Sequence, residues 1–219
     1  MGKNIVILNG SPRKNGNTSA LVQKFTQGAR QAGHTVSEFF LSDMKINGCK
    51  GCFGGHSSRP CPCVQKDDMD RIYPAIRTCD VVVLASPLYY WNFSGQLRTA
   101  MDRLFALEEN DGNLLRGHDR ACTLLMAAEG HGFGDVLTYY QHLMKHLHWT
   151  DLGHVLAGGS GQDGAEHDLI HLLGLHAGTV QSLFDDDGAQ LSSGDIGEGA
   201  AELANGSTAC AGDDDLFHK

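Results

Sequence analysis

Groups suited to binding an anion are concentrated in one segment near the start of the chain, GSPRKNGNTS, residues 10–19. Its polar side chains belong to Ser11, Arg13, Asn15, Asn17, Thr18 and Ser19. The segment lies between an apolar run and an amphipathic one, where backbone N–H groups and the positive end of a helix bind phosphate. It is neither a G-x-G-x-x-G nor a Walker sequence. From composition alone, an ordinary turn with Thr18 as the helix N-cap is an equally good interpretation.

A second chemical feature is a group of aromatic side chains in SPLYYWNF, residues 86–93. Tyr89, Tyr90, Trp91 and Phe93 follow a continuous apolar run directly. Aromatic residues in a loop of this kind favour contact with a flat ligand. A hydrophobic patch that packs against a partner subunit is compatible with the same residues.

The segments that position these groups alternate between the two hydrophobic periodicities. Strands are predicted at 3–8, 34–41, 81–85, 121–127 and 155–157, and helices at 18–32, 68–77, 94–107 and 135–147. Continuous apolar runs such as Val81–Ala85 indicate strands covered on both faces. The alternation predicts an α/β fold with a doubly wound, five-stranded parallel sheet. Ligands bind such sheets at the carboxyl ends of the strands, at the point where the strand order reverses.

Both chemical segments resemble parts of the flavodoxin-like NADPH-dependent FMN reductase family. GSPRKNGNTS is similar to the phosphate loop of that family, and SPLYYWNFSGQLRTAMDR, residues 86–103, to its loop and helix after the third strand. The resemblance covers residues 3–157. It implies the sheet order 2-1-3-4-5, FMN as cofactor, NAD(P)H as co-substrate, and a homodimer or homotetramer.

The resemblance also assigns cofactor-binding residues. Those for the FMN phosphate are Ser11, Arg13, Asn15, Asn17, Thr18 and Ser19, and those for the isoalloxazine are Pro87, Leu88, Tyr89, Tyr90, Trp91 and Asn92. Glu129 follows the fourth predicted strand and matches the family's loop beneath the flavin, although a solvated loop carboxylate is an equally good interpretation. No catalytic side chain is nominated, because the flavin itself carries hydride chemistry.

The function implied is an FMN-dependent NAD(P)H oxidoreductase. It would reduce a small acceptor, such as a quinone, a nitro compound, free flavin or a ferric chelate, by ping-pong hydride transfer through flavin N5. The alternative is an electron carrier of the flavodoxin or iron-sulfur flavoprotein kind. A flavin-bound scaffold or redox sensor is a third hypothesis.

Four cysteines, Cys49, Cys52, Cys61 and Cys63, fall within one predicted loop. Thiolates at such spacings hold zinc or iron-sulfur clusters. The iron-sulfur branch of the family carries a C-x-x-C-x-x-C run followed by a fourth cysteine, and here Gly55 occupies the third place of that run. A metal-free loop that helps to shape the substrate pocket is therefore the main interpretation, and no metal ligand is assigned.

The chain's formal charge of -9 is concentrated at its end, where residues 185–219 contribute -8. This acidic tail, rich in Gly, Ala and Ser, is predicted to be disordered and to follow a flavodoxin-like domain at residues 1–184. The near-neutral body has no basic stripe for nucleic acid and no apolar run of membrane-spanning length. An odd number of cysteines, seven, and the lack of a readable export signal predict a cytoplasmic protein.

Overall fold

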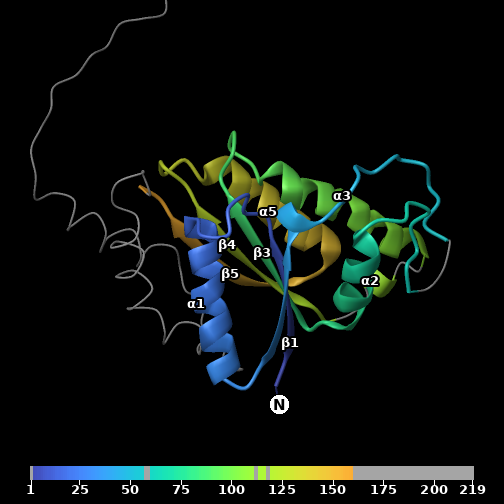
Figure 1. The fold of residues 1–219 in the computed structure, drawn as a ribbon, viewed down its shortest axis with the longest axis horizontal. Helices are drawn as coiled ribbons and strands as arrows, with labels where there is room; N and C mark the ends of the chain where they lie inside the picture. The colour runs from blue at the N-terminus through green and yellow to red at the C-terminus, as the bar shows by residue number, and fades with distance from the viewer. Residues whose placement is uncertain (1, 57–59, 111–112, 117–118, 160–219) are drawn as a thin grey trace, which may run out of the picture. The chain divides into compact units, whose positions relative to one another are not determined.

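A computed structural model describes residues 2–56, 60–110, 113–116 and 119–159. Five parallel strands form one sheet in the order β2-β1-β3-β4-β5 (Figure 1), which confirms the predicted topology. The strands are β1 Asn4–Asn9, β2 Thr35–Phe40, β3 Val81–Pro87, β4 Ala121–Ala127 and β5 Thr150–Ala157. The predicted disordered tail at 185–219 lies outside the described residues.

Helices connect the strands and cover the sheet. They are α1 Asn17–Gln31, the 3-10 turn η1 Leu41–Asp43, α2 Met69–Thr78, α3 Gly95–Asn110, α4 Asn113–Arg116 and α5 Gly134–Leu147. The sequence did not predict η1 and α4, because segments of three and four residues are too short to display a helical period. No described helix has the length and apolar character to cross a membrane.

The core lies on both faces of the sheet, and β3 contributes to each face. Val81, Val83 and Ala85 pack with residues of α1, whereas Val82 and Leu84 pack with residues of α2, α3 and α5. Successive side chains of a strand point to opposite faces, so a strand covered on both sides must be apolar throughout. The predicted central position of this strand is confirmed.

Strand β5 is longer than its sequence indicated. It was predicted only at 155–157, but it begins at Thr150 and pairs with β4 across a register shift between Cys122 and Leu124. Gly153 adopts φ +94 within the strand, and its carbonyl accepts a 2.9 Å hydrogen bond from Thr123 Oγ1. A glycine at an irregular strand position interrupts the hydrophobic pattern, and this explains the missed residues.

A buried ion pair closes the cysteine-bearing loop. The Arg103 guanidinium of α3 contacts both carboxylate oxygens of Asp67, at 2.7 and 3.2 Å, and both side chains are almost fully buried. Arg103 also donates to the Asn47 carbonyl at 2.8 Å, and the Asn47 N–H donates to Asp67 at 3.0 Å. One ion pair therefore holds the two ends of the loop together.

This pairing also determines the ionisation of Asp67. Burial alone would raise the pKa of this carboxyl, but hydrogen bonds from Arg103 and from the backbone of Asn47 and Met69 lower it below its ordinary value of 3.8. A carboxyl whose pKa is lower in the folded state stabilises the fold above its unfolded pKa. Its contribution is lost as pH falls through the lower, folded value.

We predict that Arg103→Met reduces the free energy of unfolding by about 3–5 kcal/mol, because it leaves Asp67 buried without its partner. Urea denaturation followed by circular dichroism measures this change. Arg71→Met is the matched control, since Arg71 is exposed and lies 3.9 Å from Asp68. It should cost less than about 1 kcal/mol. Similar small losses in both variants would contradict a structural role for the buried pair.

Candidate functional site

The loop between β1 and α1 leaves the start of a helix open to an anion. Helix α1 begins at Asn17 after Gly16, with neither a side-chain N-cap hydrogen bond nor an acidic residue in its first turn. The first N–H groups of a helix and its positive dipole end attract negative charge. The alternative, in which Thr18 is the N-cap, is not what the structure has, because Thr18 lies inside the first turn.

Side chains within this loop hold its backbone in a tight curl. The hydroxyls of Ser11 and Ser19 both donate to the Arg13 carbonyl, at 2.8 and 2.9 Å. Buried Asn9 accepts the Ser11 N–H at 3.0 Å and donates to Glu38 at 2.8 Å. The sequence analysis did not single out Asn9, although a polar residue at the end of an apolar strand was a visible indication.

The other predicted phosphate-loop residues differ in exposure. Arg13 and Asn15 are exposed, Asn17 is partly buried, and Thr18 is buried. All of them lie on the short stretch between the carboxyl end of β1 and the first turn of α1. The sequence-predicted set is therefore gathered around one helix end.

The loop after β3 is a tight turn with unusual backbone geometry. Tyr89 and Asn92 exchange two backbone hydrogen bonds, each 3.0 Å long. The two central residues, Tyr90 and Trp91, have φ values of +48° and +59°, as in a type I′ turn. Their side chains are exposed, 94% for Tyr90 and 61% for Trp91.

Gly10 and Ser94 join the two loops. Gly10 N–H donates to the Ala85 carbonyl at 2.8 Å, and Ser94 Oγ donates to the Gly10 carbonyl at 2.8 Å. A Cβ at position 10 would lie 2.6 Å from Ser94 Oγ, so no larger residue fits without displacement. The backbone of the loop after β1 is thus held directly against β3 and the start of α3. Neither of these two hydrogen bonds was predicted from the sequence.

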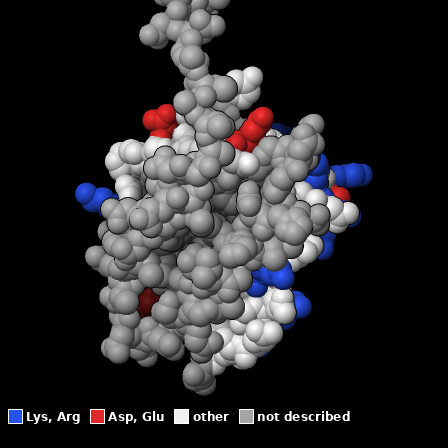
Figure 2. Space-filling model, turned by 90° about the vertical axis from the view of Figure 1, so that its left-hand side faces the viewer, with Lys and Arg blue, Asp and Glu red and all other residues white. Residues whose placement is uncertain are grey.

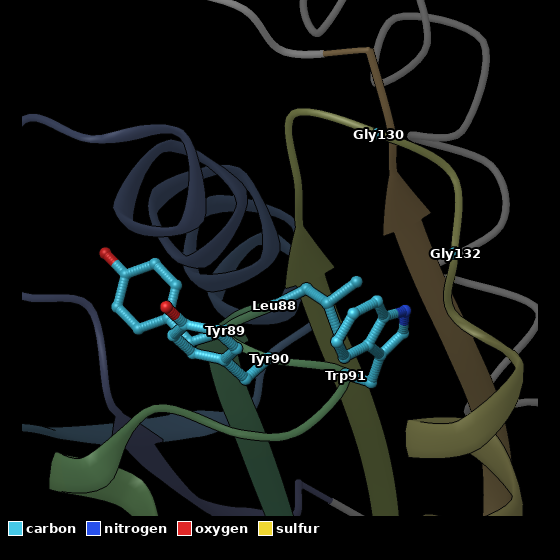
Figure 3. A pocket seen from close by; sticks show the side chains of 6 residues that line it. All are labelled: Leu88, Tyr89, Tyr90, Trp91, Gly130 and Gly132. Carbon is cyan, nitrogen blue, oxygen red and sulfur yellow. The ribbon is translucent and has the colours of Figure 1, made fainter. Parts of the chain in front are cut away.

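A cavity of about 430 Å³ opens between the loops after β3 and β4 (Figure 3). It is lined by Leu88, Tyr89, Tyr90, Trp91, Gly130 and Gly132. Leu88 N–H donates to the Ala127 carbonyl at 2.9 Å, and this bond fixes the first loop to the end of β4. The described lining carries no charged side chain and suits a flat, apolar ligand.

Three predicted contacts do not line this cavity. Pro87 ends β3, and Asn92 Oδ1 accepts the N–H of Phe93 at 2.8 Å. Glu129 is exposed beside Gly130. Pro87 and Asn92 therefore shape the turn, and the structure gives the Glu129 carboxylate no contact with the cavity.

The cysteines of the 47–67 loop occupy different environments. Cys49 and Cys52 are exposed, while buried Cys63 accepts a 3.3 Å hydrogen bond from Arg103. Burial and the nearby Asp70 raise the pKa of the Cys61 thiol. Within the described residues, no three His, Cys, Asp or Glu side chains are placed to hold a metal ion.

Gly55 is packed against α3. A Cβ at this position would lie 2.7 Å from the Glu109 Cβ and 2.9 Å from the Ala106 carbonyl. The loop lines a separate small cavity with residues of α3 and shares no described lining residue with the cavity of Figure 3. Its predicted contribution to the substrate pocket stays a prediction.

Charged side chains are scattered around the body. On the face shown in Figure 2, the described Lys and Arg residues lie at separate positions among uncharged and acidic ones. Most of the Lys and Arg atoms visible in this view lie toward its right-hand margin.

The fold and the two joined loops define a flavodoxin-like mononucleotide site at the carboxyl ends of β1, β3 and β4. The sequence matches the family model described as NADPH-dependent FMN reductase over residues 3–187. The chain belongs to this family.

Similar proteins agree with that assignment. An iron-sulfur flavoprotein from Archaeoglobus fulgidus is 40% identical over 95 residues, which cover 43% of this chain and 42% of the relative. The chain thus spans less than half the length of that relative. Among solved structures, the NAD(P)H:quinone oxidoreductase from Methanothermobacter marburgensis has a TM-score of 0.61 at 14% identity, covering 81% of this chain and 95% of the other.

A second structural neighbour contains the expected cofactor. The FMN-dependent NADH-azoreductase from Bacillus anthracis, in complex with FMN, has a TM-score of 0.59 at 14% identity, covering 82% of this chain and 98% of the other. At this identity the likeness shows the fold. Together with the family membership, these comparisons assign FMN as the cofactor.

The residues of this chain fit FMN. The N-terminus of α1, which has no side-chain cap, suits the phosphate, and the cavity lined by aromatic residues suits the ring system. They do not fit a four-thiolate cluster of the kind that the iron-sulfur relatives' names imply. Position 55 has no room for a side chain, and Cys63 is hydrogen-bonded to a buried guanidinium.

We predict that Arg13→Ala and Thr18→Ala each weaken FMN binding by about 1–3 kcal/mol, the usual contribution of charge-assisted and hydroxyl hydrogen bonds. Fluorescence titration of apoprotein with FMN measures the affinity. Thr18→Ser keeps the hydroxyl and should bind nearly as tightly as wild type. Lys14→Ala is the matched control for Arg13, because exposed Lys14 pairs with Asp43 at 2.5 Å. Wild-type affinity in both alanine variants would refute the phosphate assignment.

Proposed function

We propose that this protein is an FMN-dependent NAD(P)H oxidoreductase that reduces a small acceptor by ping-pong turnover. The observation that carries the proposal is the open cavity beside the phosphate loop, with an apolar and aromatic lining. A quinone, a nitro compound, free flavin or a ferric chelate is the expected class of acceptor. Family membership supports the nicotinamide co-substrate.

When bound, FMN would supply the redox chemistry between NAD(P)H, a hydride donor, and the acceptor. The chain's own residues would bind the cofactor, orient it and shield it from water. The α1 N-terminus would hold the phosphate, and the turn 89–92, whose backbone is fixed by its own hydrogen bonds, would lie beside the ring. Leu88 and the aromatic side chains line the cavity and would shield a bound ring from water. No side-chain acid or base is required, so none is assigned.

An electron carrier is the second candidate function, and the iron-sulfur flavoprotein relatives favour it. In that case FMN would exchange electrons with a protein partner, with or without a cluster at the cysteines. The cysteine loop argues only against the carrier that has a cluster, because Cys61 and Cys63 are engaged within the protein. A homodimer or homotetramer, with the flavin loop near the interface, is proposed for either function.

We predict that, under anaerobic conditions, the FMN-loaded protein oxidises more than one equivalent of NADH or NADPH per flavin only when an acceptor is present. Loss of nicotinamide absorbance with a quinone, a nitroaromatic and a ferric chelate measures this, and parallel double-reciprocal lines are expected for ping-pong turnover. Protein stripped of FMN is the control and should regain activity on adding FMN back. No turnover with any acceptor, together with several iron atoms per chain that disappear in Cys49→Ser/Cys52→Ser, would favour the electron carrier instead.

A further inference from the structure

The turn after β3 combines two features that rarely occur together. Tyr90 and Trp91 both adopt left-handed φ values, +48° and +59°, and both are bulky aromatic residues. A turn of this type is normally built from Asn-Gly, which adopts positive φ without strain. Large side chains in this region carry a conformational cost and persist where function requires them.

Packing in the core does not account for Trp91. Its side chain is 61% exposed, and Tyr90 is 94% exposed, so neither ring gains the burial that would offset the strained backbone. The backbone hydrogen bonds between Tyr89 and Asn92 do not require aromatic residues between them. The reason for the side chains must therefore lie in what they contact or exclude.

The Trp91 indole spans from one loop to the other. It extends from the turn after β3 toward the glycine-bearing loop after β4, as Figure 3 shows. A Cβ placed on Gly132 would lie 3.5 Å from Trp91 Nε1 and 3.8 Å from Trp91 Cδ1, which is ordinary contact distance. Gly132 and Trp91 thus face each other across the opening of the cavity.

We propose that Trp91 is a specificity-determining residue for the electron acceptor. With the flavin ring bound in the cavity, the indole would stand beside the space left over that ring and limit the size of planar acceptors that stack on it. This role keeps a tryptophan in a left-handed backbone conformation. The inference rests on the proposed function and adds the selection of substrate to it.

The test uses two substitutions that separate the ring from the backbone strain. Trp91→Ala removes the indole but keeps a Cβ in the left-handed region, and Trp91→Gly removes both. Phe53 supplies matched controls, because it also has a positive φ, +50°, is 73% exposed and does not line this cavity. Phe53→Ala therefore removes a ring and keeps the strain, and Phe53→Gly removes both, away from this cavity.

The measurement is the dissociation constant of duroquinone, with one ring, and of 9,10-phenanthrenequinone, with three. Titration of the oxidised, FMN-loaded protein, followed by flavin absorbance, requires no turnover. In both Trp91 variants, the dissociation constant of 9,10-phenanthrenequinone should fall by at least about tenfold relative to that of duroquinone. The Phe53 variants should leave the ratio unchanged, and both glycine variants should melt above their alanine counterparts.

An unchanged ratio in both Trp91 variants would overturn the proposal. It would also be overturned if FMN affinity fell in the same proportion as affinity for both quinones, because Trp91 would then only hold the cofactor. A protein that binds both quinones and does not turn over would refute the proposed oxidoreductase function alone. Normal turnover with an unchanged ratio would refute the role of Trp91 alone.

Discussion

The order β2-β1-β3 sends the chain to opposite faces of the sheet after β1 and after β3. Helix α1 follows β1 and packs with Ile7 and Val83, whereas α3 follows β3 and packs with Val82 and Leu84. Two neighbouring parallel strands whose connections diverge leave a crevice at their carboxyl ends. The phosphate loop and the aromatic turn meet at this crevice because the topology leaves them no other place.

Small contacts turn this general crevice into a defined site. The absence of a side chain at Gly10 lets the loop backbone bond to Ala85 and Ser94, and the Leu88 N–H links the aromatic turn to β4. These bonds employ backbone groups and one hydroxyl, so the aromatic side chains and the start of α1 stay available to a ligand. The Arg103–Asp67 pair closes the cysteine loop through side chains that do not line this cavity.

Much of this arrangement was predictable from the sequence, and the exceptions have physical causes. Continuous apolar runs located β3 and β4, because strands covered on both faces need no polar residue. Most of β5 was missed because Gly153 breaks its pattern. The polar residues between β1 and α1 were singled out by their types, and their binding of phosphate stays a prediction. The left-handed turn was not predicted, since aromatic pairs seldom adopt it. The Arg103–Asp67 pair joins residues 36 positions apart, which local periodicity does not reveal.

The proposed function requires one site that binds the phosphate and the ring system of FMN together. The most direct test is calorimetric titration of the apoprotein with FMN and with riboflavin, which has the same ring system without the phosphate. Several charge-assisted hydrogen bonds to the phosphate predict one FMN per chain and riboflavin binding weaker by at least about a hundredfold. Equal affinity for the two flavins would contradict the account, because the loop between β1 and α1 would then not bind the phosphate.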